Sequence, residues 1–208
     1  MSEEARREPD AARLAAARRA LDQATQGASA ATDRPSSRSA PSPDPTAEME
    51  GYARARQIVL RQLAMGPRSR QQLADKLSNR GVEREVIDRV LDRMVQVGLV
   101  DDEAFAATLV RSKHHGTGMA PRALRHELRK KGVSEEIAER AVGTVDADDQ
   151  RARAEQLVAE RLPRLHGLDR EVQTRRLAGV LARKGYSSGL SLSVIRDALD
   201  RAPEHVRD

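Results

Sequence analysis

Cysteine is absent from this 208-residue sequence, which removes disulfide bonds, thiolate metal sites and cysteine nucleophiles together. Aromatic residues are almost as scarce, since only Tyr52, Phe105 and Tyr186 occur. Any core must therefore consist of small aliphatic side chains, and stacking on single-stranded bases is a poor option. No apolar run approaches the roughly 20 residues that cross a bilayer, and the N-terminus lacks the apolar stretch of a secretory signal. We therefore expect a cytoplasmic protein without a membrane segment.

Helix-forming residues dominate what is present. Ala, Leu, Arg, Glu and Gln are abundant and lose little rotamer freedom on a helix surface. No segment shows the sustained period-two alternation of β-branched residues that strands require. The net charge of +5 is unevenly placed. Residues 1–50 carry seven Arg and nine acids, about −2, which leaves about +7 for the rest.

Composition divides the chain into an N-terminal extension, a patterned region and a short tail. The extension covers residues 1–50, with a candidate short helix over 13–26 and a linker over 33–46 that holds four prolines. The tail covers residues 203–208. The patterned region divides into three repeats, over residues 51–101, 102–148 and 149–202.

The repeats align on a glycine, namely Gly81, Gly132 and Gly185. Leucine precedes each glycine by eight and by four residues, and apolar side chains follow at five, nine, ten and thirteen residues. Apolar residues also lie 23 positions before each glycine, at Ile58, Leu109 and Leu162, which would keep the first helices in register. Agreement at so many positions indicates a true internal repeat.

Each repeat is predicted to contain three helices, with the glycine in the turn between the second and the third. A basic last turn precedes each glycine, as expected for a helix that ends at a left-handed residue. Ser69 with Gln72 resembles a capping box, Ser134 suits an N-cap, and the aspartates at 101–102 and 148–149 can cap first helices. We therefore predict an all-α protein of three tandem, helix-turn-helix-like units without a wing, stacked into an elongated, curved array.

Catalytic and metal-binding interpretations find little support. The glycines near Gly116 and Gly118 lack the remainder of a phosphate-binding loop. His114 and His115 are adjacent, so on a helix they point to different faces. The acidic pairs could imitate a carboxylate cluster, but helix capping explains them more simply. We expect no enzyme activity, no catalytic residue, no metal and no cofactor.

Electrostatics carries the functional information, because the second helix of each repeat is basic and the third helix leans acidic. One such helix is usually only a solvated face, but equivalent helices of a repeat array line up on one side. The three would then form a basic stripe for a polyanion or an acidic partner. Arg122, Arg125 and Arg129 are expected to share a face opposite Leu124 and Leu128. The candidate binding residues are Arg122, Arg125, Arg129, Lys130, Lys131, Arg175, Arg176, Arg183 and Lys184.

Two parts of the sequence carry a pattern more specific than the repeat. Residues 98–106, with the series Gly98-Leu-Val-Asp-Asp-Glu-Ala-Phe-Ala, are followed by Val110-Arg111, Gly118 and the run 122–133. Together they resemble the central signature of the RecX family of regulators. Residues 181–186, Leu-Ala-Arg-Lys-Gly-Tyr, resemble the ending of that family's third repeat. The likeness covers residues 52–200 and leaves the N-terminal extension without a counterpart.

The resemblance implies a cytoplasmic regulator that binds the RecA recombinase. It would lie in the groove of the RecA filament on DNA and suppress filament growth, ATP hydrolysis and strand exchange, so modulating recombination, DNA repair and the SOS response. Direct contact with DNA and a monomeric state are further expectations. The rival interpretation is a winged-helix transcription regulator, because residues 58–100 resemble two helices of such a domain; it would require a β-hairpin wing after Val100. A third alternative is a scaffolding repeat for an unrelated partner.

Overall fold

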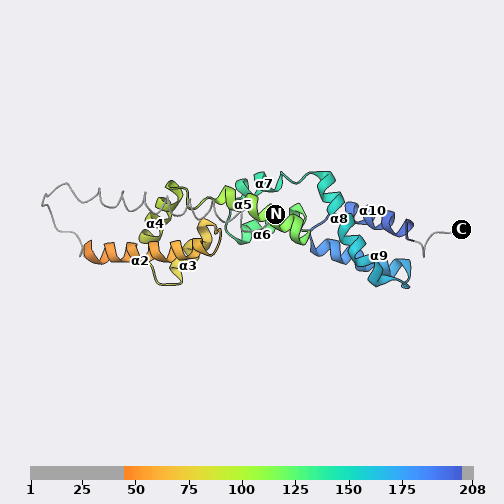
Figure 1. The fold of residues 1–208 in the computed structure, drawn as a ribbon, viewed down its shortest axis with the longest axis horizontal. Coiled ribbons are helices and arrows are strands. Elements are labelled where there is room, and N and C mark those ends of the chain that lie inside the picture. The colour runs from red at the N-terminus through yellow and green to blue at the C-terminus, as the bar shows by residue number, and fades with distance from the viewer. Residues whose placement is uncertain (1–44, 203–208) are drawn as a thin grey trace, which may run out of the picture. The chain divides into compact units, whose positions relative to one another are not determined.

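The computed structural model describes residues 45–202, and all the regular structure in that range is helical (Figure 1). The prediction of an all-α protein is confirmed, and no strand occurs within these residues. The candidate helix over 13–26 and the tail over 203–208 lie outside the described range. The helices are α2 (Pro45–Ala64), α3 (Arg70–Ser78), α4 (Arg84–Gln96), α5 (Asp102–Thr117), α6 (Pro121–Lys130), α7 (Glu135–Val142), α8 (Ala147–Arg161), the 3-10 turn η2 (Leu162–Leu165), α9 (Arg170–Arg183) and α10 (Ser188–Asp200).

The chain forms two compact units that meet between Asp101 and Asp102. The N-terminal unit holds the first repeat, α2–α4, and the C-terminal unit holds the second repeat, α5–α7, and the third, α8–α10. Each repeat has its own cluster of buried aliphatic side chains. The six leucines that the glycine alignment placed in the second helices are all 0–1% exposed: Leu73, Leu77, Leu124, Leu128, Leu177 and Leu181.

The predicted turn and cap chemistry is confirmed where local sequence specifies it. Gly81, Gly132 and Gly185 have φ of +74°, +75° and +88°, a region that glycine enters without the steric cost of a Cβ. Ser69 and Gln72 form the capping box, and the Ser134 side chain accepts a hydrogen bond from the Ile137 amide. These short-range devices fix where the helices of the repeats begin and end.

Three helix starts differ from the prediction. The N-cap of α8 is Asp146, whose carboxylate accepts from the Asp149 amide at 2.7 Å, so the pair at 148–149 lies in the first turn and does not cap the helix. The sequence of residues 187–191, Ser-Ser-Gly-Leu-Ser, predicts a long loop, but the segment is helical from Ser188, because the Ser187 side chain caps α10. α2 begins at Pro45, inside the predicted linker, which is compatible with proline because a first helical residue needs no amide hydrogen.

The first helix of the third repeat is out of register with the glycine alignment. A buried Ala-x-x-x-Val pair marks the core face of each first helix: Ala55 and Val59, Ala106 and Val110, Ala154 and Val158. Relative to the glycine, the third pair lies five residues earlier than the other two. Leu162, predicted to match Ile58 and Leu109, instead begins the turn η2. Pro163 interrupts this region, as proline does within a helix. Eight residues join α8 to α9, where three join α5 to α6.

The winged-helix interpretation predicted a hairpin after Val100, at the end of the first repeat. The chain enters α5 at Asp102, and the second repeat follows without a strand in the described residues. The first repeat therefore has the helices of such a domain without its wing.

Candidate functional site

Ion pairs join the second helix of each repeat to the third, and they use part of the predicted basic surface. In the second repeat, Arg125 of α6 contacts both carboxylate oxygens of Glu139 on α7, at 2.5 and 2.8 Å. Arg129 lies 3.5 Å from Glu135. Both arginines therefore face α7, and their charge is offset within the repeat.

In every repeat at least one pair follows a rule, in which the two residues lie at equal distances from the turn glycine. Two longer pairs do not follow it, Arg70–Asp88 at 3.6 Å and Arg125–Glu135 at 3.9 Å. Arg125 and Glu139 each lie seven residues from Gly132, and Arg129 and Glu135 each lie three residues from it. The rule extends to the other repeats, with Arg70 and Asp92 eleven residues from Gly81, 2.7 Å apart, and Arg170 and Asp200 fifteen residues from Gly185. The helices run antiparallel around the glycine, so residues at equal distances from it come side by side. The opposite charges at equal distances before and after each glycine are visible in the sequence, but a comparison of the repeats with one another does not show them.

A different set of cations points to solvent. Arg122 and Lys130 of α6 lie ten and two residues before Gly132, and Arg175 and Arg183 of α9 lie ten and two residues before Gly185. All four side chains are exposed, and none has an ion-pair partner among residues 45–202. We call Arg122, Lys130, Arg175 and Arg183 the basic row. It is the part of the predicted site that remains available to a partner.

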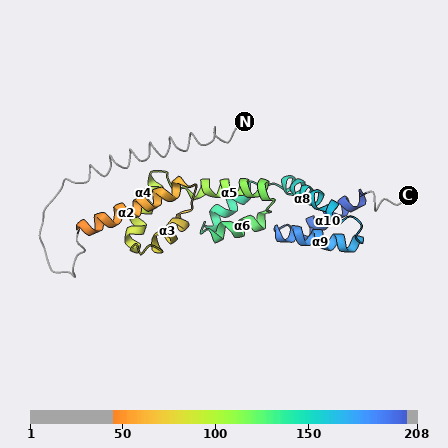
Figure 2. The same cartoon turned by 60° about the horizontal axis from the view of Figure 1, so that its bottom comes forward.

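The two halves of the basic row belong to helices that meet end to end in the C-terminal unit. The Ala120 amide, just before α6, donates to the Lys184 carbonyl, just after α9, at 2.9 Å. A Cβ on Gly185 would lie 2.7 Å from the Ala123 amide nitrogen, so the two backbones are in contact. Figure 2 shows α9 ending where α6 begins. The second and third repeats therefore present their exposed cations along α6 and α9, which meet end to end.

Some of the remaining predicted residues are paired or half-buried, and others are exposed. Lys131 lies 3.4 Å from Glu127 and is half-buried. Arg176 is exposed, while Lys184 is half-buried and its carbonyl joins the repeats. In the first repeat, Gln71 and Asn79 occupy the positions of the basic row. The predicted triple stripe therefore has exposed cations at equivalent positions only in the second and third repeats.

Titratable groups elsewhere serve the packing. His114 is 2% exposed, and its Nδ1 lies 2.9 Å from the Met119 carbonyl, so this histidine closes the end of α5. Arg140 of α7 forms an ion pair with Glu103 of α5. Its hydrogen bond to Glu136 is the largest cause of the raised pKa of the Arg140 guanidinium. No group of three or more candidate metal ligands occurs within residues 45–202, and no helix there is long and apolar enough to cross a membrane.

The described residues form tandem three-helix repeats, and the second and third repeats present exposed cations, which defines a helical repeat protein with a basic surface. A family model described as "RecX, first three-helix domain" matches residues 55–94, and "RecX, second three-helix domain" matches residues 101–142. The regulatory protein RecX of Streptomyces lividans is 49% identical over 150 residues, which cover 72% of this chain and 80% of that relative. The RecX of Mycolicibacterium smegmatis is 41% identical over 185 residues, 85% of this chain and 98% of that one. The chain belongs to the RecX family of regulatory proteins.

A solved structure supports the fold independently. The crystal structure of RecX from Lactobacillus salivarius superposes with a TM-score of 0.66 at 20% identity, over 72% of this chain and 97% of that one. The family models and the sequence relatives confirm the family predicted from the sequence runs, and with it the prediction of a regulator in place of an enzyme.

Proposed function

We propose that this protein binds the filament that the RecA recombinase forms on DNA and inhibits its growth, its ATP hydrolysis and strand exchange. The family relationship supports a regulatory role, and the resemblance names the recombinase as the partner. We further propose that the protein acts in the cytoplasm as a monomer and modulates recombination and DNA repair.

The observation that carries the proposal is the basic row. Four exposed cations without an ion-pair partner among residues 45–202 are expected to attract anionic groups of a binding partner. Three of the four are arginines, whose planar guanidinium donates two parallel hydrogen bonds to phosphate or carboxylate. A filament of protein on DNA offers both groups. We propose that the row contacts phosphates of the bound DNA, with acidic side chains of the filament as the alternative anion.

The direct test measures ATP hydrolysis by the RecA of the host organism on single-stranded DNA while this protein is added. We expect hydrolysis to fall with a saturable dependence on concentration. Unchanged hydrolysis, together with no binding of the protein to sedimented filaments, would refute the proposal.

A pair of matched triple variants tests whether the basic row carries the contact. The test variant is Arg122→Glu, Arg175→Glu and Arg183→Glu. The control is Arg111→Glu, Arg161→Glu and Arg196→Glu, three exposed arginines on α5, α8 and α10. Arg161 matches Arg183 because both lie in the last turn of a helix. Each variant changes the net charge equally, so any difference between them reports position.

We expect the test variant to bind the filament at least tenfold more weakly than the control. Circular dichroism and thermal unfolding establish that both variants are folded. Equal weakening of both would mean that net charge alone governs binding, and the row would lose its assignment.

A further inference from the structure

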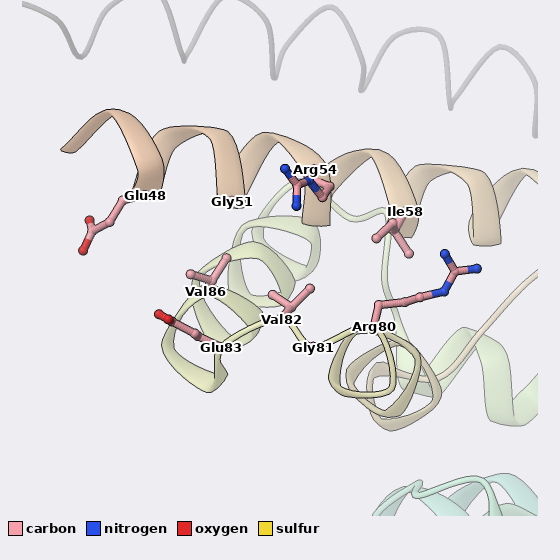
Figure 3. Close-up of a pocket in the computed structure, with 9 residues that line it drawn as sticks. All are labelled: Glu48, Gly51, Arg54, Ile58, Arg80, Gly81, Val82, Glu83 and Val86. Atoms are coloured by element: carbon pink, nitrogen blue, oxygen red, sulfur yellow. The ribbon is translucent and has the colours of Figure 1, made fainter. Parts of the chain in front are cut away.

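The first repeat contains an open pocket of about 330 Å³ between α2 and the turn that joins α3 to α4. Its apolar part consists of Ile58 from α2, Val82 from the turn and Val86 from α4 (Figure 3). The volume lies at the small end of the range for ligand sites. The pocket therefore has room for one or two side chains, and too little for a large cofactor.

Each of the other repeats has a buried aromatic side chain at one of the corresponding positions. Alignment of the first helices on the buried Ala-x-x-x-Val pair makes Phe105 the counterpart of Arg54. Phe105 is 9% exposed and belongs to the same buried cluster as Val133, the residue that follows Gly132. In the third repeat the residue after the glycine is Tyr186, which is 5% exposed and belongs to the buried cluster of that repeat. The buried aromatic side chain comes from the first helix in the second repeat, as Phe105, and from the turn in the third repeat, as Tyr186.

The first repeat has neither device. Its helix carries the exposed Arg54 where α5 carries Phe105, and its turn carries only Val82, which is half-buried where Val133 and Tyr186 are buried. Two glycines enlarge the space, because a Cβ added to Gly51 or to Gly81 would meet no atom within 4 Å. The first repeat therefore leaves exposed an apolar surface at which the second and third repeats have a buried aromatic side chain.

Charged side chains of opposite sign stand on the two sides of this opening. Figure 3 shows Glu48 and Glu83 on one side and Arg80 on the other, with Val82 and Val86 between them. Arg54 also lines the pocket. Glu48 also lies 3.7 Å from Arg89 of α4, so Glu83 is the carboxylate more open to a partner. The partner that complements this arrangement has an apolar centre, a cation toward Glu83 and an anion toward the arginines. Side chains of a peptide supply all three, as in a hydrophobic anchor surrounded by polar contacts.

We propose that this pocket binds a protein segment of a partner, which inserts one aromatic or large aliphatic side chain between α2 and the α3–α4 turn and flanks it with one acidic and one basic residue. The inserted side chain takes the place that Phe105 and Tyr186 take in the other repeats. Under the proposed function, the recombinase carries this segment, and only that assignment rests on the proposed function.

Variants that fill the pocket from within test the proposal on the filament. Gly51→Leu adds an aliphatic side chain where no atom obstructs it, and Arg54→Phe copies the second repeat. The matched controls are Gly189→Leu, at a helical glycine that also has no atom within 4 Å, and Arg61→Phe, at an exposed arginine on α2 that does not line the pocket. We expect the two filling variants to bind the filament about tenfold more weakly than wild type, and the controls to bind like wild type. Filling variants that bind like wild type would overturn the inference and leave the proposed function standing.

A second measurement does not depend on the recombinase. The full chain, labelled with ¹⁵N, is titrated with the peptides Asp-Ala-Phe-Ala-Lys and Lys-Ala-Phe-Ala-Asp, and with Asp-Ala-Ala-Ala-Lys as the control. We expect at least one phenylalanine peptide to shift the amide signals of Gly51, Gly81 and Val82, and the alanine peptide to leave them unchanged. Equal responses, or none at millimolar peptide, would overturn the proposal. Shifts at the same amides on deletion of residues 1–44 would also overturn it, because the occupant would then be the chain's own N-terminal segment.

Discussion

The hydroxyl of Tyr186 is buried in the third repeat without a hydrogen-bond partner in the described protein. Burial raises the pKa of this phenol, and the nearby charge of Arg153 opposes part of the rise. Tyr186 thus contributes an apolar ring at the expense of an unsatisfied polar atom, a cost of roughly 1–3 kcal/mol in such sites.

Tyr186→Phe should therefore leave stability at pH 7 unchanged or raise it by up to about 1 kcal/mol, because the ring remains and the buried hydroxyl is removed. The wild type should lose more stability than the variant above about pH 10, where a phenol in the unfolded chain begins to ionise. In that range the native state still holds the proton that the unfolded state has released, so rising pH favours unfolding. Urea unfolding of both proteins between pH 7 and pH 11 measures the difference. Parallel curves would mean that Tyr186 titrates alike in both states.

Gly185 differs from Gly81 because it contacts the neighbouring repeat. Its φ of +88° already favours glycine, and the Ala123 backbone leaves no room for a Cβ. Gly81 shares the left-handed conformation, but open space surrounds it. A substitution at Gly81 therefore tests the cost of backbone strain alone, and one at Gly185 tests the cost of strain together with close packing.

Gly81→Ala should cost only the left-handed penalty, roughly 1–2 kcal/mol. Gly185→Ala should cost about 1–3 kcal/mol more, since the contact with Ala123 must also open. The free energies of unfolding from denaturant titrations test the comparison. Equal losses would contradict the close approach between α9 and α6.

At the scale of the helices, ion pairs at equal distances from the turn glycine join the second helix of each repeat to the third. The pair is best formed in the second repeat, where the Arg125 side chain is 30% exposed and bridges both oxygens of Glu139. Exposed pairs contribute little, about 0.2–1 kcal/mol. Their placement still supports the packing of the second helix against the third, because each of these arginines lies opposite a carboxylate.

Arg125→Glu should destabilise the second repeat by about 1 kcal/mol, because the new carboxylate faces Glu135 and Glu139. Arg125→Glu combined with Glu139→Arg should recover at least half of the loss by re-forming the pair. Thermal unfolding of the wild type, both single variants and the double variant gives the coupling. A double variant that is no more stable than the sum of the single losses would show that the pair has no energetic role.

Part of this arrangement could be predicted from the sequence. The glycine turns, the capping box at Ser69 and the leucine core depend on neighbours a few residues away, so their signals are local. The register of α8 was mispredicted because Leu162 is apolar and falls at the expected distance, although Pro163 ends the helix there. The division of the candidate site also escaped prediction. Arg122 and Arg125 look alike in sequence, and only the position of α7 makes one exposed and the other paired.

At the scale of the whole molecule, the distribution of charge matters more than the net value. Most acidic residues of the third helices of the first and second repeats face arginines of their own repeats, and the basic row lies on consecutive helices of the C-terminal unit. Contacts from such a row to DNA phosphates release bound counterions, which makes the affinity fall steeply with salt.

The logarithm of the affinity for the RecA–DNA filament should fall linearly with the logarithm of salt concentration. Arg122→Ala and Arg175→Ala should each reduce the slope by about one, because each removes one phosphate contact. Fluorescence anisotropy at several salt concentrations measures the slopes, with Arg196→Ala as the exposed control. A weaker affinity with an unchanged slope would identify acidic side chains of the filament, instead of DNA phosphates, as the anions that the row contacts.

The sequence by itself determined the helical class, the three repeats, the turn glycines and the family, because each depends on composition, short-range geometry or the order of residues along the chain. Tertiary structure decided which cations remain exposed, how the second and third repeats join at Gly185, and that the first repeat has an open pocket where the others hold Phe105 or Tyr186. These features depend on which side of a helix faces its neighbour and on whether a distant side chain reaches a given space. Residue type and spacing along the chain do not specify either.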